Sequence, residues 1–225
     1  MKLQLHIQMN EALFLRNPEG SELGKKIIKH SIQLIHKNGF ESLTFKKLAE
    51  DIGTTEAGIY RYFENKHNLL VYLVSWYWGW LEFMISFHTN NIKDPTTRLK
   101  KVIKILASTV EDYEQTSYVD ERLLHQIVIV EGSKAYLTKQ VGEDNKHEFF
   151  KPYKDLCAVI GDIITECNPQ YKYPRSLATT IIEMAHFQNF FMHNLPALTD
   201  FGQTKDDTKV VTFLNDLVFS SIKKS

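Results

Sequence analysis

The sequence predicts an all-α protein, with a small three-helix domain near the N-terminus followed by a larger helical bundle. Apolar residues recur at three- and four-residue spacing through nearly the whole chain, which is the period of an amphipathic helix. Residues that start helices and residues that end them divide this pattern into short segments. At 225 residues, the chain is long enough to bury a core without disulfides or metal ions.

Only the first residues depart from the helical period. Leu3, Leu5, Ile7 and Met9 alternate with polar residues, which is the period of a strand. A small hairpin with the apolar run at residues 12–15 and a frayed arm are both compatible with this pattern. The polar residues also interrupt any apolar signal-peptide core, so we expect no export.

Three short helices are expected next, each with a side chain that can cap its N-terminus. Ser21 can cap the first helix, which stops at Gly39. Thr44 can cap the second, which ends at Gly53, and Thr55 can cap the third.

Longer helices follow. Asn65 can cap a fourth helix that reaches about residue 87. Asp94 and Pro95 place a cap before a first-turn proline, which predicts a fifth helix to about residue 115. The remaining helices are expected near residues 120–130, 133–142, 147–166, 174–193 and 206–223.

The fourth helix also raises the possibility of a membrane span. Residues 69–87 contain no Lys or Arg and are long enough to cross a bilayer. Glu82 lies inside this stretch, and its tryptophans gather near the middle rather than in two interfacial belts. We therefore expect a buried helix of a soluble protein, and no membrane as a partner.

Charge and cysteine content narrow the class of protein. The chain has 27 Lys and Arg against 27 Asp and Glu, which argues against a strongly basic nucleic-acid coat protein but allows a specific reader with a local basic patch. Cys157 and Cys167 lack the spacing of a zinc site or a redox pair. We expect reduced thiols in a cytoplasmic protein, and neither a metal ion nor a cofactor.

The second and third predicted helices have the layout of a helix-turn-helix DNA-binding motif. Ala49 offers a small side chain where the two helices cross, and Gly53 can adopt the left-handed conformation that redirects the chain. Ile59 then packs the third helix back against the second. The outer face of the third helix is left free for the major groove of DNA.

Residues on and around the third helix are therefore candidates for contacts with double-stranded DNA. Small residues at its N-terminus let the backbone approach base edges, and the Tyr, Arg and Lys residues after them can bind phosphates. Two of them also have structural interpretations: core packing for Tyr60, and attraction to the helix dipole for Glu56. The candidate DNA-binding residues are Thr44, Thr55, Glu56, Ala57, Gly58, Tyr60, Arg61, Tyr62 and Lys66.

This window resembles the TetR/AcrR family of transcriptional regulators over about residues 22–70. It departs from the family pattern at Thr54, where an aliphatic residue is usual, and at Glu56. The matching residues are Gly39, Phe40, Thr44, Leu48, Ala49, Gly53, Thr55, Ile59, Tyr60, Tyr62, Phe63, Lys66, Leu69 and Leu70.

The resemblance implies a homodimer, most often a repressor, that binds operator DNA and responds to a small-molecule effector. It divides the chain into an extension over residues 1–20, a helix-turn-helix domain over 21–65, and a ligand-binding and dimerisation domain over 66–225. It implies that the last two helices form the dimer interface, and both are rich in apolar residues: Thr179, Ile182, Phe187, Phe190, Phe191, Leu195, Val210, Phe213, Leu214, Leu217 and Phe219.

Aromatic residues of the C-terminal part are candidates for lining an effector pocket, with ordinary core packing as the alternative for each. These candidates are Trp76, Trp80, Phe83, Phe87, Tyr113, His125 and Phe150.

A helical enzyme or carrier of the ferritin-like kind, without DNA binding, is the alternative interpretation. Glu183 and His186 have the spacing used in di-iron bundles, but such sites need a second motif of the same kind. The other match, Glu64 with His67, overlaps the DNA-binding motif. The sequence contains no nucleophile elbow, phosphate loop or dinucleotide fingerprint, so we expect no enzymatic activity.

Overall fold

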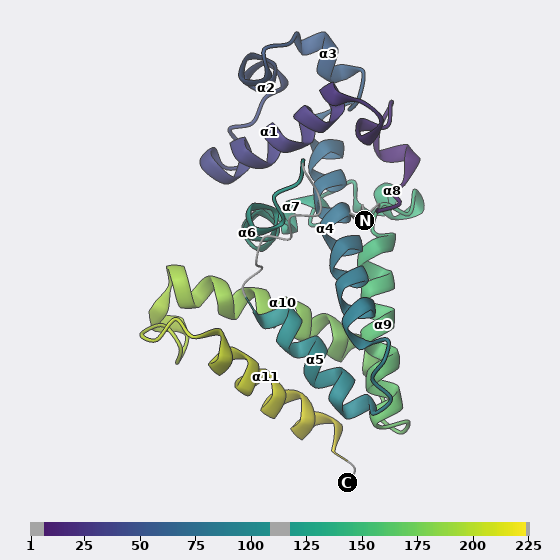
Figure 1. Ribbon diagram of the computed structural model, residues 1–225, viewed down its shortest axis with the longest axis vertical. Helices are drawn as coiled ribbons and strands as arrows, with labels where there is room; N and C mark the ends of the chain where they lie inside the picture. The colour runs from purple at the N-terminus through teal and green to yellow at the C-terminus, as the bar shows by residue number, and fades with distance from the viewer. Residues whose placement is uncertain (1–6, 109–117, 224–225) are drawn as a thin grey trace. The chain divides into compact units, whose positions relative to one another are not determined.

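The computed structural model describes residues 7–108 and 118–223, and within these ranges every regular element is a helix (Figure 1). The sequence-based prediction of an all-α protein is confirmed. The α-helices are α1 (Glu22–Asn38), α2 (Phe45–Ile52), α3 (Glu56–Tyr60), α4 (Lys66–Thr89), α5 (Pro95–Ala107), α6 (Glu121–Glu131), α7 (Ser133–Tyr136), α8 (Val141–Lys146), α9 (Lys151–Cys167), α10 (Pro174–Asn194) and α11 (Asp207–Ile222).

The chain forms two compact units. The first unit contains Met1–Trp80 and Val110–Pro152, and the second contains Leu81–Thr109 and Tyr153–Ser225. Within the first unit, α6 packs against α1, although the two helices are far apart in sequence. A hydrogen bond joins them, with His36 Nε2 and Gln126 Oε1 2.7 Å apart.

The core of the first unit follows the predicted apolar pattern. The isoleucines of α1 at the expected spacing are all buried, as are Leu48 of α2 and Ile59 of α3. Helix α4 is long and apolar enough to cross a membrane, but 78% of its most apolar window is buried inside the structure. It is thus built like the core helix that the sequence predicts.

In the part that the structure describes, the segment before α1 is a packed arm without a hairpin. Its described part, from residue 7 onward, contains two 3-10 turns, Glu11–Leu13 and Pro18–Gly20, and residues 3–6 of the predicted strand lie outside the described ranges. The Leu13 side chain is fully buried, and the Leu15 N–H donates to the Tyr62 carbonyl oxygen at 2.8 Å. The arm is therefore part of the first unit's core.

Three helix predictions are wrong in detail. Helix α5 ends at Ala107 rather than near residue 115, because Ser108 has an extended backbone (φ −83°, ψ 145°). The helix expected over residues 133–142 is represented by the short α7, because the chain leaves the helical conformation at Leu137 (φ −83°, ψ 58°). Helix α8 lies mostly in the break that was expected before residue 147. Helix α9 starts at Lys151 rather than near residue 147, since Glu148 has a positive φ of 59° that ends the preceding helical turn.

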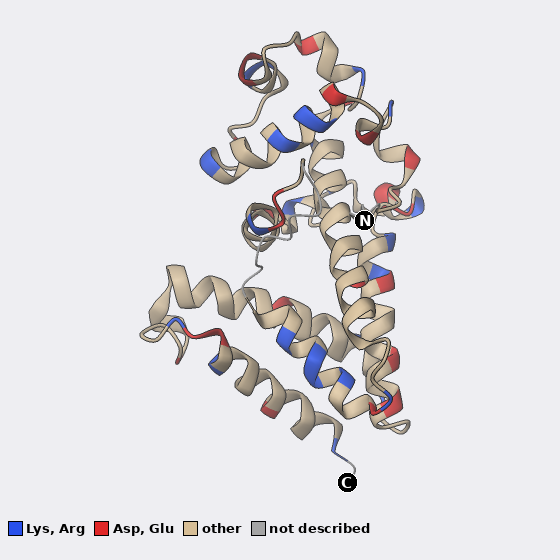
Figure 2. Ribbon diagram, viewed as in Figure 1, with Lys and Arg blue, Asp and Glu red and all other residues tan. Residues whose placement is uncertain are grey.

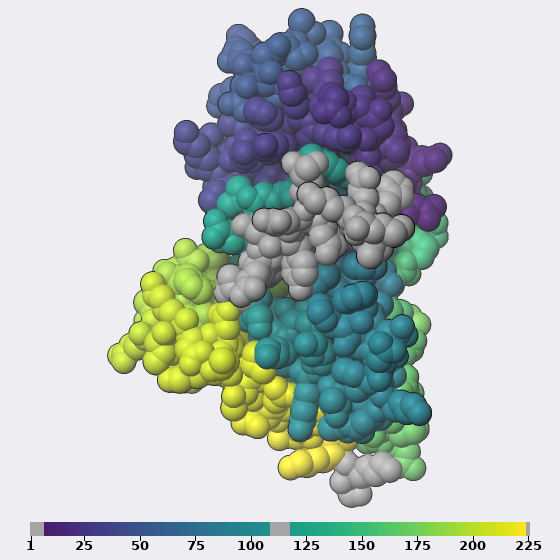
Figure 3. Space-filling model, in the orientation of Figure 1, coloured from purple at the N-terminus to yellow at the C-terminus, as the bar shows by residue number. Residues whose placement is uncertain are grey.

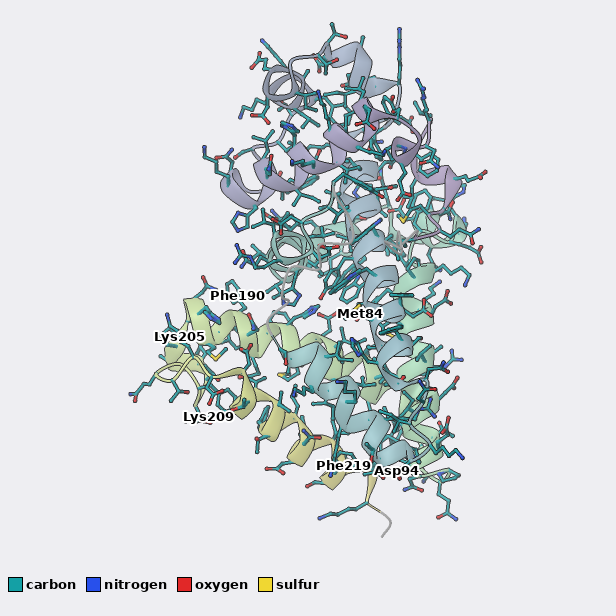
Figure 4. The ribbon with its side chains drawn as sticks, viewed as in Figure 1. Met84, Asp94, Phe190, Lys205, Lys209 and Phe219 are labelled. Atoms are coloured by element: carbon teal, nitrogen blue, oxygen red, sulfur yellow. The ribbon has the colours of Figure 1, made fainter. Side chains whose placement is uncertain are left out.

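The second unit is built from α5, α10 and α11, which pack on one another, together with α9 (Figure 1). Asn168 Nδ2 donates to the Ile222 carbonyl oxygen at 3.0 Å, and so fastens the end of α9 to the end of α11. Phe219 lies near the C-terminal end of α11 (Figure 4). The Lys100 ammonium is 5.6 Å from the centre of the Phe219 ring. This cation–π contact joins α5 to α11.

Candidate functional site

The turn between α2 and α3 has the local geometry that the sequence predicts for a helix-turn-helix motif. Thr44 Oγ1 accepts the Lys47 N–H at 3.2 Å, and Thr55 Oγ1 accepts the Gly58 N–H at 3.2 Å, so both helices carry their expected caps. Gly53 closes α2 in the left-handed conformation, with φ 76° and ψ 40°. Glycine is favoured there because a Cβ would add strain.

Helix α3 turns one face inward and the other to solvent. Ile59 is fully buried, whereas Glu56, Ala57 and Arg61 are exposed and Gly58 is half-buried. A short helix held by one buried side chain, with its remaining residues in water, is the arrangement of a recognition helix.

The two phenols near the end of α3 have different environments. The Tyr60 side chain is 47% exposed, and its ring packs edge-on against Phe45 at 4.9 Å between centroids. It therefore combines the predicted core contact with an accessible hydroxyl.

Tyr62, in contrast, is buried, and its hydroxyl lies 2.7 Å from Ser21 Oγ, the cap of α1. The expectation that both phenols are exposed is wrong for Tyr62, because the arm and the start of α1 cover it. The Arg16 guanidinium from the arm lies 5.4 Å from the centre of the Tyr62 ring. The sequence prediction missed Arg16, since no motif marks it.

Basic side chains are available near this face. Figure 2 shows Lys and Arg residues along α1 in the first unit. Lys66, the first residue of α4, has its ammonium group 3.3 Å from the Glu41 carbonyl oxygen and 4.7 Å from the centre of the Phe40 ring. Thr44 is exposed at the start of α2. Of the predicted DNA-binding residues, only Tyr62 has a buried side chain, and all belong to the first unit.

The predicted pocket residues do not share one environment. In the first unit, Trp76, Trp80 and His125 are buried, and Phe150 is half-buried. In the second unit, the exposed rings of Phe83 and Phe87 stack on each other at 6.0 Å.

Tyr113, the remaining pocket candidate, lies outside the described residues.

A buried polar contact that the sequence did not predict lies among the first unit's aromatic residues. The Tyr77 hydroxyl is 2.7 Å from His125 Nδ1, and both side chains are buried. Burial raises the pKa of Tyr77 well above the ordinary value of a phenol. The available sequence signal was a tyrosine within the aromatic cluster of the fourth helix.

The residues of the expected dimer face differ in their exposure. Several of its members are more than one-third exposed: Phe187, Leu195, Phe213 and Leu217. Ile182, Val210 and Leu214 are instead buried inside the second unit, because each faces a neighbouring helix. In the space-filling view, α10 and α11 contribute a continuous surface of the second unit (Figure 3).

The motif that suggested a di-iron site does not form one in the part of the chain that is described. Glu183 Oε1 accepts a hydrogen bond from the Tyr153 hydroxyl at 2.7 Å. Within residues 7–108 and 118–223, no group of three or more His, Cys, Asp or Glu side chains is placed to hold a metal ion.

The all-helical fold and the exposed face of α3 define the class of protein as a DNA-binding transcriptional regulator of the helix-turn-helix type. Residues 27–73 match the model of the bacterial regulatory proteins of the tetR family. The matched residues span most of α1, all of α2 and α3, and the start of α4.

Solved structures of similar fold cover most of the chain. FadR from Bacillus subtilis, in complex with stearoyl-CoA, has a TM-score of 0.65 and 17% identity, over 88% of this chain and 98% of that one. AibR, in complex with isovaleryl coenzyme A and operator DNA, has a TM-score of 0.60 and 15% identity, over 87% and 98%. FadR from Bacillus halodurans has a TM-score of 0.59 and 20% identity, over 86% and 92%. No curated protein matches the chain in sequence.

Proposed function

We propose that the chain is a ligand-responsive repressor of the cytoplasm that binds operator DNA as a homodimer and acts by binding rather than by catalysis. The observation that carries this proposal is helix α3. It is capped by Thr55 and anchored by the buried Ile59, whereas Glu56, Ala57 and Tyr60 are exposed. A short capped helix with an exposed outer face has the arrangement that enters a major groove in helix-turn-helix proteins.

The contacts with DNA divide by position on α3. Glu56, Ala57 and Gly58 at its N-terminus meet base edges, where Ala57 can touch a thymine methyl and Glu56 can accept from a cytosine amine. Tyr60 and Arg61, at its C-terminus, bind phosphates.

Thr44 and Lys66, at the starts of the flanking helices, bind phosphates as well. Tyr62 is left out of this set, because its hydroxyl is already bonded to Ser21 inside the protein.

The dimer forms through α10 and α11. Their exposed apolar side chains, which include Phe187 and Phe213, form a face that is costly to leave in water. A two-fold dimer presents two recognition helices about 34–36 Å apart for successive turns of DNA.

The effector binds among the aromatic residues beside the Tyr77–His125 pair. This part of the first unit combines large apolar rings, Trp76 and Trp80, with a hydroxyl and an imidazole that can orient a ligand. AibR and the Bacillus subtilis FadR were solved with acyl-CoA molecules. Acyl-CoA thioesters are therefore the first effectors to test. An effector that binds one conformation better shifts the protein toward it and changes DNA affinity accordingly.

DNA binding is tested by selection from a random pool of duplexes. Fluorescence anisotropy then measures the affinity of the purified protein for an enriched duplex and for a scrambled control across a range of salt. We expect selective, salt-dependent binding that weakens with Arg61→Ala. If no duplex is enriched over the scrambled sequence, the proposed function is wrong.

The oligomer and the effector are tested separately. We expect a dimer in analytical ultracentrifugation, converted to monomer by Phe187→Glu or Phe213→Glu but not by the control Phe87→Glu, whose side chain is 67% exposed on α4. Stearoyl-CoA and isovaleryl-CoA are titrated into the protein–DNA complex beside free coenzyme A. Release of DNA by an acyl-CoA but not by free coenzyme A supports this effector class.

A further inference from the structure

The turn between α1 and α2 is held by a carboxylate from another part of the first unit. Glu131, the last residue of α6, accepts the Phe40 N–H through Oε1 at 3.0 Å. Glu131 is only 7% exposed. Gly39, with φ 77°, brings the backbone so close that a Cβ there would lie 3.3 Å from the same oxygen. The position of this turn therefore depends on α6.

Glu131 is also the first member of a row of charged residues of alternating sign, which continues with Lys134, Glu41 and Lys66. The Lys134 ammonium of α7 lies 2.7 Å from Glu131 Oε2 and 3.3 Å from Glu41 Oε1. The Lys66 ammonium lies 3.8 Å from Glu41 Oε2. The Glu41 carboxylate thus lies between two ammonium groups, Lys134 from α7 and Lys66 from the start of α4.

The two lysines compete for one carboxylate. The ion pair with Glu131 contributes most to raising the pKa of Lys134, so this lysine stays charged. When Lys134 neutralises Glu41, the carboxylate holds Lys66 less strongly and repels an approaching phosphate less strongly. Without Lys134, Glu41 would hold Lys66 as its only ammonium partner within this row.

We propose that Lys134 is a positioning residue for DNA binding: by neutralising Glu41, it leaves Lys66 available to a DNA phosphate. This inference rests on the proposed function, because it requires Lys66 to contact DNA. Lys134 itself need not touch DNA. Its effect passes through Glu41, and its position is set by Glu131 and therefore by α6.

Through this row of charged residues, binding of an effector could change the affinity for DNA. Helix α6 also carries His125, which is bonded to Tyr77 at the proposed effector site. An effector that shifts α6 would withdraw Glu131 and Lys134 from the α1–α2 turn. Glu41 would then hold Lys66, and affinity for DNA would fall.

The test uses the full-length protein and a duplex that the wild type has enriched from a random pool. We expect Lys134→Met to weaken binding about two- to fivefold, the effect of a partly exposed ion pair. The slope of log affinity against log salt should lose up to about 0.9 in magnitude, the share of one phosphate contact. Lys134→Arg should keep both values near those of the wild type.

A double-mutant cycle separates positioning from direct contact. Glu41→Gln removes the carboxylate for which the lysines compete, and Glu41 is 74% exposed at its side chain, so the variant should fold. In this background, Lys134→Met should cause no further loss of affinity or slope. An undiminished loss would mean that Lys134 binds DNA directly and would overturn the proposal.

The matched control is Lys146→Met. Lys146 forms an i,i+3 ion pair with Glu143 at 2.6 Å, as Lys134 does with Glu131, but this pair lies within α8 and does not include the α1–α2 turn. Equal affinities for Lys134→Met, Lys146→Met and the wild type would also overturn the proposal. A wild-type protein that enriches no duplex would instead refute the proposed function, so the two failures are distinguishable.

Discussion

The Tyr77 hydroxyl and the His125 Nδ1 atom lie 2.7 Å apart in the interior of the first unit, joining α4 to α6. Trp80 lies on the same part of α4, with its ring 5.8 Å from that of Tyr77. A polar pair between two helices in an apolar core fixes their register more strictly than apolar packing does, because a misplaced partner leaves a buried polar group unsatisfied.

Tyr77→Phe should lower the free energy of unfolding at pH 8 by about 1–3 kcal/mol, the cost of removing one partner of a buried hydrogen bond. Urea denaturation measures this loss. Tyr173→Phe is the control, because Tyr173 is 63% exposed, and it should change stability by less than about 0.5 kcal/mol. Equal losses in both variants would contradict a special role for the pair.

The buried Tyr77 should also make the protein less stable at alkaline pH. Burial raises the pKa of Tyr77 in the folded state, so the folded protein keeps a proton that the unfolded chain begins to release near its ordinary pKa of 10.0. Stability from this group is complete below pH 10 and falls as the pH rises above it. Above pH 10, the free energy of unfolding should fall more steeply with pH in the wild type than in Tyr77→Phe. The difference in slope should be up to about 1.4 kcal/mol per pH unit. Parallel curves for the two proteins would refute this assignment.

The two phenols near α3 should respond differently to loss of their hydroxyl groups. Tyr60→Phe keeps the ring contact with Phe45, so its melting temperature should match that of the wild type while its affinity for a selected duplex falls. Tyr62→Phe removes the bond to Ser21 and should lower stability by about 0.5–1.5 kcal/mol. Calorimetry measures the stability of both variants, and fluorescence anisotropy measures their affinity for the duplex. The reverse pattern would mean that Tyr62 is the phosphate contact.

The arm should contribute to stability through one side chain. Leu13 is fully buried, so Leu13→Ala should cost about 2–5 kcal/mol in urea denaturation. Leu15→Ala is the matched control, because this side chain is 67% exposed and its bond to Tyr62 uses only the backbone. A Leu13→Ala variant as stable as Leu15→Ala would show that the arm is not part of the core.

Replacing Gly53 in the α2–α3 turn should lower the free energy of unfolding more than replacing Gly142 in α8 does. No atom lies within 4 Å of a Cβ at this position, so the cost of Gly53→Ala is conformational and amounts to about 1–2 kcal/mol at its φ of 76°. Gly142→Ala also meets no atom within 4 Å, but Gly142 lies in α8 without a positive φ. The control should be neutral or slightly stabilising in thermal melts.

The helix-turn-helix motif was predictable because its signals are local. The caps at Thr44 and Thr55, the left-handed turn at Gly53 and the buried Ile59 each depend on neighbouring residues, and all lie as expected. The long α4 was predictable for a similar reason. Helix breaks between residues 133 and 150 were not, because Leu137 and Glu148 have no side-chain signal that ends a helix.

The exposure of individual site residues depended on distant parts of the chain. Tyr62 looks like an exposed phenol in sequence, yet the arm and Ser21 bury it. Phe83 and Phe87 were predicted to line a pocket, yet both are exposed. Helical periodicity assigns a residue to a face of its helix, but only the packing of other helices determines whether that face is covered.

By itself, the sequence determined the all-α class, the three capped N-terminal helices and the residues that α3 turns outward, since these follow from backbone propensity and short-range spacing. The tertiary structure alone placed Glu131 and Lys134 beside Phe40 and Glu41, and Tyr77 beside His125. Pairings of this kind join residues far apart along the chain. They arise from how α1, α4 and α6 pack, a property of the assembled core that no local pattern encodes.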